Sequence, residues 1–130
     1  MKKLFLSILL ALSIFTLASC HYSSYKAVLL IRQNTKETSS VTFESFKGRL
    51  VQKIEKTSND NENLSYEGSI TGGELTIYYE IMGDVKELFT LKSGESVKDT
   101  LTGIKKGTKV YIIIEAPEKV EEGHFNFSVK

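Results

Sequence analysis

The chain has 130 residues, of which 41% are hydrophobic and 25% are charged, and its formal net charge is +1 at pH 7. This balance gives no reason to expect nucleic acid or anionic lipid headgroups as partners. A single cysteine excludes an internal disulfide, so one domain of this length must be stabilised by its hydrophobic core.

The first twenty residues have the three parts of a secretory signal. Met1-Lys2-Lys3 is basic, residues 4–17 are mostly apolar, and Ala18-Ser19 precedes Cys20. The apolar run is shorter than the roughly 20 residues that a membrane-spanning helix needs. An ordinary secreted protein cleaved after Ser19 is the other alternative, but Leu17 stands where plain cleavage sites prefer a small residue.

The tetrapeptide Leu17-Ala18-Ser19-Cys20 resembles the bacterial lipobox, in which the cysteine sulfur receives a diacylglyceryl group before the signal is removed. The resemblance implies a signal peptide over residues 1–19 and a lipidated Cys20 on the extracytoplasmic face of the cell membrane. Two acyl chains on one residue are sufficient for stable attachment. Residues 20–25 then form the lipidated cysteine and a short tether, and residues 26–130 form a single domain.

Beyond the tether, alternation of apolar and polar residues predicts β-strands. The apolar run over residues 27–31 is typical of a buried strand. The alternation over residues 41–54 slips by one position between Glu44 and Phe46, which indicates a bulge or a corner between two strands. The polar residues 56–63 predict a loop.

The second half of the chain continues the same pattern. Residues 64–70 and 75–81 alternate on either side of Gly72-Gly73, which predicts a hairpin. Residues 87–91 and 97–101 predict two short strands, and the run over residues 110–114 is apolar on both faces, as in a central strand. The segment from Pro117 to Gly123 suits a single helical turn before a last strand over residues 125–129.

About eight strands with regularly spaced turns predict an all-β fold. We expect an antiparallel two-sheet β-sandwich, immunoglobulin-like or jelly-roll-like, with a small β-barrel as the alternative. No segment is long enough to supply the crossover helices that parallel strands require.

Residues 66–130 contain a series of turn and packing residues: Gly68-Ser69-Ile70, Gly72-Gly73, Leu75-Thr76-Ile77, Phe89-Thr90-Leu91, Gly94, Gly107, Tyr111-Ile112-Ile113-Ile114-Glu115-Ala116 and Gly123-His124-Phe125-Asn126-Phe127. In these residues the chain resembles a recurring module of small membrane lipoproteins from low-GC Gram-positive bacteria. The resemblance implies export and a β-sandwich fold. The activity of this group is largely unassigned, so the resemblance implies no site residues.

Catalytic groupings are scarce in this sequence. His124 is the only base available to a serine nucleophile outside the tether, and no Gly-x-Ser-x-Gly motif is present. Glu121, Glu122 and His124 fall in a stretch of mixed charge that predicts a solvated loop rather than a metal site. The Asn-rich loop that starts at Asn59 lacks the glycine and glutamate of an EF-hand. We therefore predict no enzyme activity, no metal and no cofactor.

Three side chains are candidates for binding. Tyr78 and Tyr111 fall opposite the apolar rows of their strands, where aromatic rings can stack on a sugar or a partner protein. The alternative is that Tyr111 packs within a strand that is buried on both sides. His124 is the third candidate and is expected to face solvent, opposite Phe125.

Taken together, the sequence predicts a lipid-anchored, non-enzymatic β-sandwich that binds a protein or a cell-envelope glycan. One alternative is an enzyme or an accessory subunit of the cell envelope, which would require a polar cleft with glutamate around His124. Another is a carrier of a small apolar ligand, which would require an apolar cavity.

Overall fold

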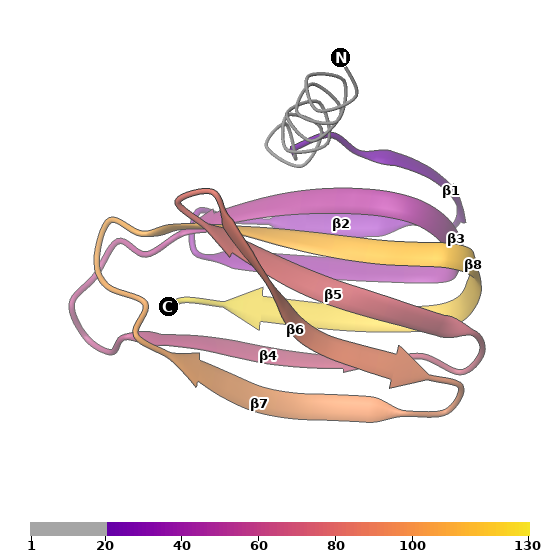
Figure 1. Ribbon diagram of the computed structural model, residues 1–130. Coiled ribbons are helices and arrows are strands. Elements are labelled where there is room, and N and C mark those ends of the chain that lie inside the picture. Colours follow the sequence, from indigo (N-terminus) through magenta and orange to yellow (C-terminus); the bar gives the residue numbers. More distant parts are fainter. Residues whose placement is uncertain (1–20) are drawn as a thin grey trace, which may run out of the picture.

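The computed structural model describes residues 21–130, so the predicted signal peptide and Cys20 lie outside the described residues. It contains eight strands, all paired antiparallel (Figure 1), which confirms the predicted all-β fold. No helix within residues 21–130 has the length and apolar character that a membrane crossing requires. The strands are β1 (Ser24–Val28), β2 (Ile31–Asn34), β3 (Thr38–Glu55), β4 (Asn63–Ser69), β5 (Glu74–Ile81), β6 (Asp84–Lys92), β7 (Ser96–Thr102) and β8 (Lys109–Ser128).

The two long strands, β3 and β8, pair with each other over nearly their whole length and pass through both layers of the sandwich. The first half of β3 and the second half of β8 form layer one, in the order β2-β3-β8-β4-β7. Their other halves form layer two, in the order β1-β3-β8-β5-β6. No ladder joins β6 to β7 in the described part, so the sheet stays open and the barrel alternative is wrong.

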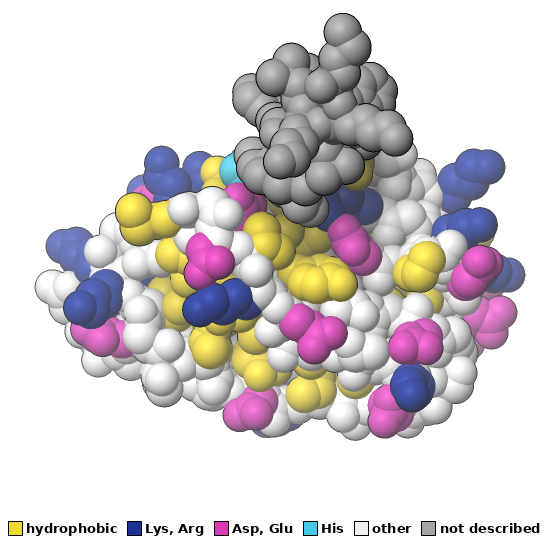
Figure 2. All heavy atoms as spheres, viewed as in Figure 1, with side chains coloured by type: hydrophobic (Ala, Val, Ile, Leu, Met, Phe, Trp, Pro, Cys, Tyr) yellow, Lys and Arg dark blue, Asp and Glu magenta, His cyan; other side chains and the backbone are white. Residues whose placement is uncertain are grey.

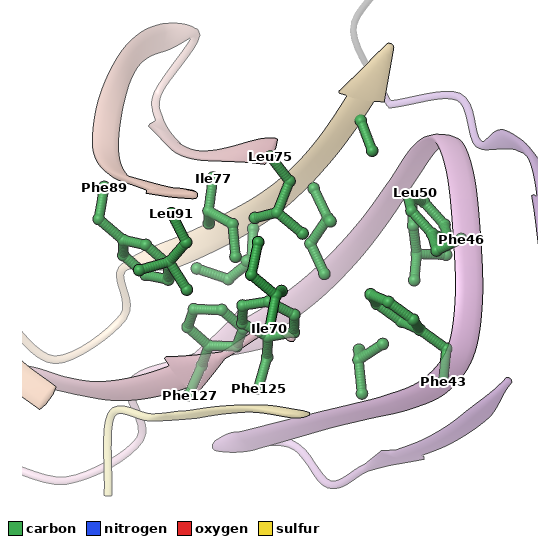
Figure 3. Packing of buried hydrophobic residues seen from close by; sticks show 14 of the residues in the cluster. Phe43, Phe46, Leu50, Ile70, Leu75, Ile77, Phe89, Leu91, Phe125 and Phe127 are labelled. Atoms are coloured by element: carbon green, nitrogen blue, oxygen red, sulfur yellow. The ribbon is translucent and has the colours of Figure 1, made fainter. Parts of the chain in front are cut away.

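The layers meet at a bend in the middle of both long strands. The register of β3 against β8 shifts between Phe46 and Gly48, directly after the position between Glu44 and Phe46 where the sequence predicts a bulge or corner. Figure 3 shows β3 curving between Phe43 and Leu50. Gly48 has φ +120°, and a Cβ there would lie 2.4 Å from the Ser24 carbonyl oxygen, so the crossing of β1 requires glycine.

The predicted helical turn from Pro117 to Gly123 is wrong, because these residues lie within β8. The extra residues after Ala116 are the ones that the register shift leaves unpaired, and they carry β8 from one layer to the other. Proline and a run of charges are typical of a connection, but here they form the bulged outer side of a bent strand.

Two predictions for the N-terminal part of the domain are also wrong. Residues 24 and 25 are not free tether, because they already belong to β1 and pair with Arg49 and Gly48. The apolar run over residues 27–31 is not one buried strand: it turns at Leu29, which has φ +52°, and joins β1 to β2. These short strands lie at the edges of the two layers, where side chains gain little burial.

The space between the layers is filled by one hydrophobic cluster (Figure 3). Aromatic rings from both halves of the chain meet there, with centroids 5.3 Å apart for Phe43 and Phe46 and 6.3 Å apart for Phe89 and Phe125. Layer two contributes aliphatic side chains such as Ile77 and Ile114, which are fully buried. The outward-facing residues of each layer are therefore held on a rigid packed support.

Candidate binding face

The outer face of layer one presents mostly polar side chains in three rows, of which two cross all five strands and one crosses four. On β3, Val41 and Phe43 point into the core, so Ser40 and Thr42 point outward. Strand register places the outward residues of neighbouring strands side by side. The central row is Gln33, Ser40, Asn126, Glu67 and Lys98; one flanking row is Thr38, Ser128, Ser65 and Thr100, and the other is Ile31, Thr42, His124, Ser69 and Ser96.

This face is hollowed into a groove. A hollow of about 1110 Å³ extends over β2, β3, β8, β4 and β7, and a second hollow of about 410 Å³ adjoins it. Glu67, Lys98 and Asn126 line both hollows, so the central row runs through the whole groove. His124 lines the smaller hollow. We call this surface the polar groove.

Most hydrogen-bonding groups of the polar groove are open to a ligand. Asn126 Nδ2 donates a hydrogen bond of 3.2 Å to Glu67 Oε1, which holds these two side chains together. In the described chain, Lys98 forms no ion pair, although it lies directly across from Glu67. The groove therefore offers an ammonium group, a carboxylate, an amide and several hydroxyls at one surface.

The outer face of layer two contains the two predicted tyrosines. Tyr111 and Tyr78 lie on β8 and β5, opposite Glu80 and Ile113 respectively. The ring of His21 stacks on Tyr111 with a centroid separation of 3.8 Å and an interplanar angle of 10°. Tyr111 is thus covered by the chain itself, and neither of the predicted arrangements describes its surroundings.

Tyr78 remains partly exposed on the same face. Burial raises the pKa of its hydroxyl above the ordinary value, and the nearby carboxylates of Glu115 and Glu87 raise it further. Figure 2 shows hydrophobic side chains mixed with acidic and basic ones over β5 and β6. Tyr78 and Tyr111 therefore share one face of the molecule, whereas His124 lies on the opposite layer.

Residues 21–23 lie against this face of layer two. The His21 Nε2 atom is 2.6 Å from Oε2 of Glu80, a side chain that is almost fully buried. Arg49 donates from Nε to the Tyr22 carbonyl oxygen at 3.3 Å and lies over the Tyr22 ring. The backbone N–H of Val51 donates to Ser23 Oγ at 2.9 Å. His21, which the sequence places in a free tether, is thus a docked residue.

The geometry around His124 lacks the parts of a nucleophilic or metal site. Its Nδ1 atom lies 3.5 Å from the Thr42 hydroxyl, and no carboxylate within residues 21–130 forms a hydrogen bond to its ring. The same range contains no group of three side chains that could hold a metal ion. Glu121 and Glu122, which the sequence places in a loop, belong to β8.

Sequence reasoning missed most of the polar groove. Each strand shows its outward polar residues by alternation, and this signal was available for Ser65 and Glu67 on β4 and for Asn126 on β8. Alternation within a strand does not reveal which strands are neighbours. The order β2-β3-β8-β4-β7 joins segments far apart in the sequence, so the rows appear only in the folded protein.

Comparison with known proteins assigns no family: no family model matches the chain, and no curated protein matches it. Several solved structures are similar to the chain at low identity and low TM-score. The Clostridium difficile EutQ protein is 14% identical, with a TM-score of 0.40, over 87% of this chain and 75% of that chain. A cupin-2 domain protein from Shewanella frigidimarina is 16% identical, with a TM-score of 0.35, over 91% and 90% of the two chains. A CBM29-2 carbohydrate-binding module complexed with mannohexaose is 12% identical, with a TM-score of 0.40, over 82% and 89%.

These similarities are too low to add to the description of the chain. Its own strand pairing makes it an all-β, antiparallel domain. The ligand and the role of this chain have to be inferred from its own surface.

Proposed function

We propose that the protein is a lipoprotein, anchored through Cys20 on the extracytoplasmic face of the cell membrane, and that its sandwich is a non-enzymatic domain that binds a cell-envelope glycan. The polar groove is the binding site. The observation that carries this proposal is the set of in-register polar rows, which line a groove of about 1110 Å³ across five strands of layer one.

A glycan fits the chemistry of these rows. Sugar hydroxyls both donate and accept hydrogen bonds. The central row combines three side chains that do the same with one carboxylate and one ammonium group. Neighbouring strands are about 4.8 Å apart, so a row across five strands spans about 19 Å. A linear oligosaccharide lying along the row would place successive sugar units over successive strands.

The same rows favour a glycan over a protein partner. Protein interfaces depend on buried anchors, most often Trp, Tyr or Arg. His124 is the only ring among the outward side chains of the three rows. Arg32 and Tyr66 line the groove, but Arg32 is bonded to Gln52 and Tyr66 stacks on Phe89. The two predicted tyrosines lie on layer two, where His21 already covers Tyr111.

Binding is favoured over catalysis and over transport of an apolar ligand. A hydrolase would need a base that is oriented by an acid, whereas the ring contact of His124 is to the Thr42 hydroxyl. An apolar carrier would need an open interior. The interior is instead packed with side chains such as Phe125 and Leu75, which are 1% exposed.

The test of the groove uses polysaccharides isolated from the envelope of the producing bacterium and the detergent-solubilised lipoprotein. Glu67→Gln combined with Asn126→Ala is expected to weaken polysaccharide binding about tenfold or more, because it removes hydrogen bonds that involve a charged group. The melting temperature should stay unchanged, because both side chains are exposed. Calorimetric titration measures the affinity.

The matched control is Glu87→Gln, which neutralises an exposed glutamate on the outer face of layer two. This variant should bind polysaccharide as the unaltered protein does. Equal binding by the groove variant and the control, or no binding of any envelope polysaccharide, would rule out the proposed site.

The anchor is tested separately. In Cys20→Ala the acceptor thiol is absent, so the protein should accumulate as an unprocessed or soluble form. Mass spectrometry of the unaltered protein should find an acylated Cys20 at the mature N-terminus. A mature N-terminus at any other residue would contradict the proposal.

A further inference from the structure

The docked residues 21–23 fix the place on the domain where the described chain begins. Consecutive Cα atoms are about 3.8 Å apart, so Cys20 must be close to His21. His21 in turn is held on the outer face of layer two by Glu80 and by the ring of Tyr111. The acyl chains on Cys20 would therefore enter the bilayer from beside this face.

Exposed apolar side chains surround the same point. Val85 is the cross-strand partner of Glu80, and Met82 follows Glu80 by two positions in the β5–β6 turn. Met82 is 98% exposed, Tyr22 is 59% exposed and Val85 is 41% exposed. Figure 1 shows the β5–β6 turn on the same side of the molecule as the start of β1. We call Tyr22, Met82 and Val85 the anchor corner.

The charged groups of this face are compatible with contact to lipid headgroups. The Glu80 carboxylate pairs with His21, the Glu115 carboxylate pairs with Arg49, and Glu87 accepts a hydrogen bond of 2.9 Å from the Thr90 hydroxyl. These three acidic side chains are thus partnered within the domain, while Lys53, which lies beside Tyr111, is exposed. Tyrosine rings are also favoured at the membrane–water interface.

We propose that the anchor corner rests on the bilayer and that the polar groove, on the opposite layer, faces away from the membrane. This inference rests on the lipidation of Cys20 that forms part of the proposed function. Lipid contact removes the apolar surface of Met82 and Val85 from water, which is the favourable term that orients the domain. A polysaccharide outside the membrane then has direct access to the groove.

A second exposed apolar patch lies elsewhere and serves as a comparison. Val28, Leu29 and Ile31 are 52%, 72% and 57% exposed at the junction of β1 and β2. A strand rises about 3.3 Å per residue, so the five residues of β1 place Leu29 at least about 16 Å along the chain from the docked segment. We assign bilayer contact to the anchor corner and not to this patch.

The test uses the full-length lipoprotein in vesicles of phosphatidylcholine and phosphatidylglycerol. Cys20 is the only cysteine, and acylation consumes its thiol, so an introduced cysteine is the one site that a thiol-reactive fluorophore labels. Met82→Cys, Leu29→Cys and Lys98→Cys place the label at the anchor corner, at the comparison patch and in the groove. All three positions are exposed, so the folding of each variant should be unaffected.

Quenchers attached to lipid chains should reduce the fluorescence at position 82 several-fold more than at positions 29 and 98. A water-soluble quencher should instead reduce the fluorescence at positions 29 and 98 more than at position 82. His21→Ala releases the docked segment and should bring the lipid quenching at position 82 down towards that at position 98. Quenching at position 98 or 29 equal to or above that at position 82 would overturn the proposed orientation.

Mass spectrometry of the same preparations separates the two proposals. If Cys20 is acylated and position 82 is not the most quenched, the orientation is wrong and the anchor stands. If Cys20 is not acylated, both the anchor and the orientation fail. Polysaccharide binding by vesicle-bound protein should match binding in detergent, because the groove stays accessible.

Discussion

The outer faces of the two layers use the same two strands and differ sharply in character. In layer one, β3 and β8 contribute polar outward residues such as Ser40 and Asn126, and the face is an open groove. In layer two, β8 contributes Tyr111 and Ile113, and β3 contributes their partners Val51 and Lys53. Ile113 is only 1% exposed although it is not part of the central core cluster. Each long bent strand thus contributes residues to one core and to two separate surfaces, and the two surfaces can have different functions.

The largest effect should come from the core that supports both faces. Phe125 is 1% exposed and lies between the rings of Phe43 and Phe89. Phe125→Ala should lower the free energy of unfolding by about 3–5 kcal/mol, because it removes a buried ring and leaves a cavity. The neighbouring variant Asn126→Ala should change it by less than about 0.5 kcal/mol. Chemical denaturation measures both, and equal stabilities would contradict the assignment of the inward and outward sides of β8.

The next effect concerns the bend that separates the faces. A Cβ at Gly123 would lie 2.2 Å from the Phe43 ring, so Gly123→Ala forces this buried ring to move. We expect a loss of about 1–3 kcal/mol in unfolding free energy, as for other overpacked cores. At Gly72, a Cβ would meet only the flexible Glu121 carboxylate, at 3.2 Å, so Gly72→Ala is the matched control and should cost less. A larger loss for Gly72→Ala than for Gly123→Ala in a thermal unfolding experiment would show that Gly123 of β8 does not pack against the Phe43 ring.

The features that could be predicted from the sequence are those that depend on residues close to one another along the chain. Alternation placed Tyr79 of β5 on the core side and Tyr78 on the outside, and it placed His124 in solvent, all of which the structure confirms. Alternation also indicated the bend near Phe46, because the phase of β3 slips just before it; the extra residues of the register shift itself lie on β8.

What the sequence could not predict depends on segments that are distant along the chain. Glu80 has the outward phase of a solvent-exposed side chain, yet it is 4% exposed and pairs with His21, which is 59 positions away. Pro117 and the charges that follow it favour a connection, and only pairing with β3 makes them part of β8. The polar groove has the same origin, since its rows require the order of five strands.

A smaller expected effect, on the hydrogen exchange of the Val51 amide, tests whether residues 21–23 are docked in solution. The Val51 N–H donates to Ser23 Oγ, so Ser23→Ala should remove a contribution of about 0.5–1.5 kcal/mol to the protection of that amide. Hydrogen exchange at Val51 should then become about 2- to 10-fold faster. Ser40→Ala, on the opposite layer, should leave Val51 exchange unchanged. Unchanged exchange in the Ser23 variant would indicate that the segment is not held on layer two.

The smallest expected effect is a change of the unfolding free energy with pH in alkaline solution. It is tested with one tyrosine from each layer. Burial raises the pKa of Tyr66, on β4, and nearby Asp99 and Tyr79 raise it further; burial, Glu115 and Glu87 raise the pKa of Tyr78. The unfolded chain loses these protons near the ordinary value of 10.0, whereas the folded protein holds them to higher pH. The raised pKa values of Tyr66 and Tyr78 therefore contribute fully to the free energy of unfolding below pH 10. This contribution is lost as pH rises from there through the folded-state pKa values.

Unfolding free energies measured at several alkaline pH values, together with phenolate absorbance, follow this loss. Tyr66→Phe and Tyr78→Phe should each make the decline less steep, because each removes one titrating group. If only Tyr66→Phe alters the slope, the carboxylates beside Tyr78 are screened by solvent, and the outer face of layer two is more open than its contacts with residues 21–23 imply.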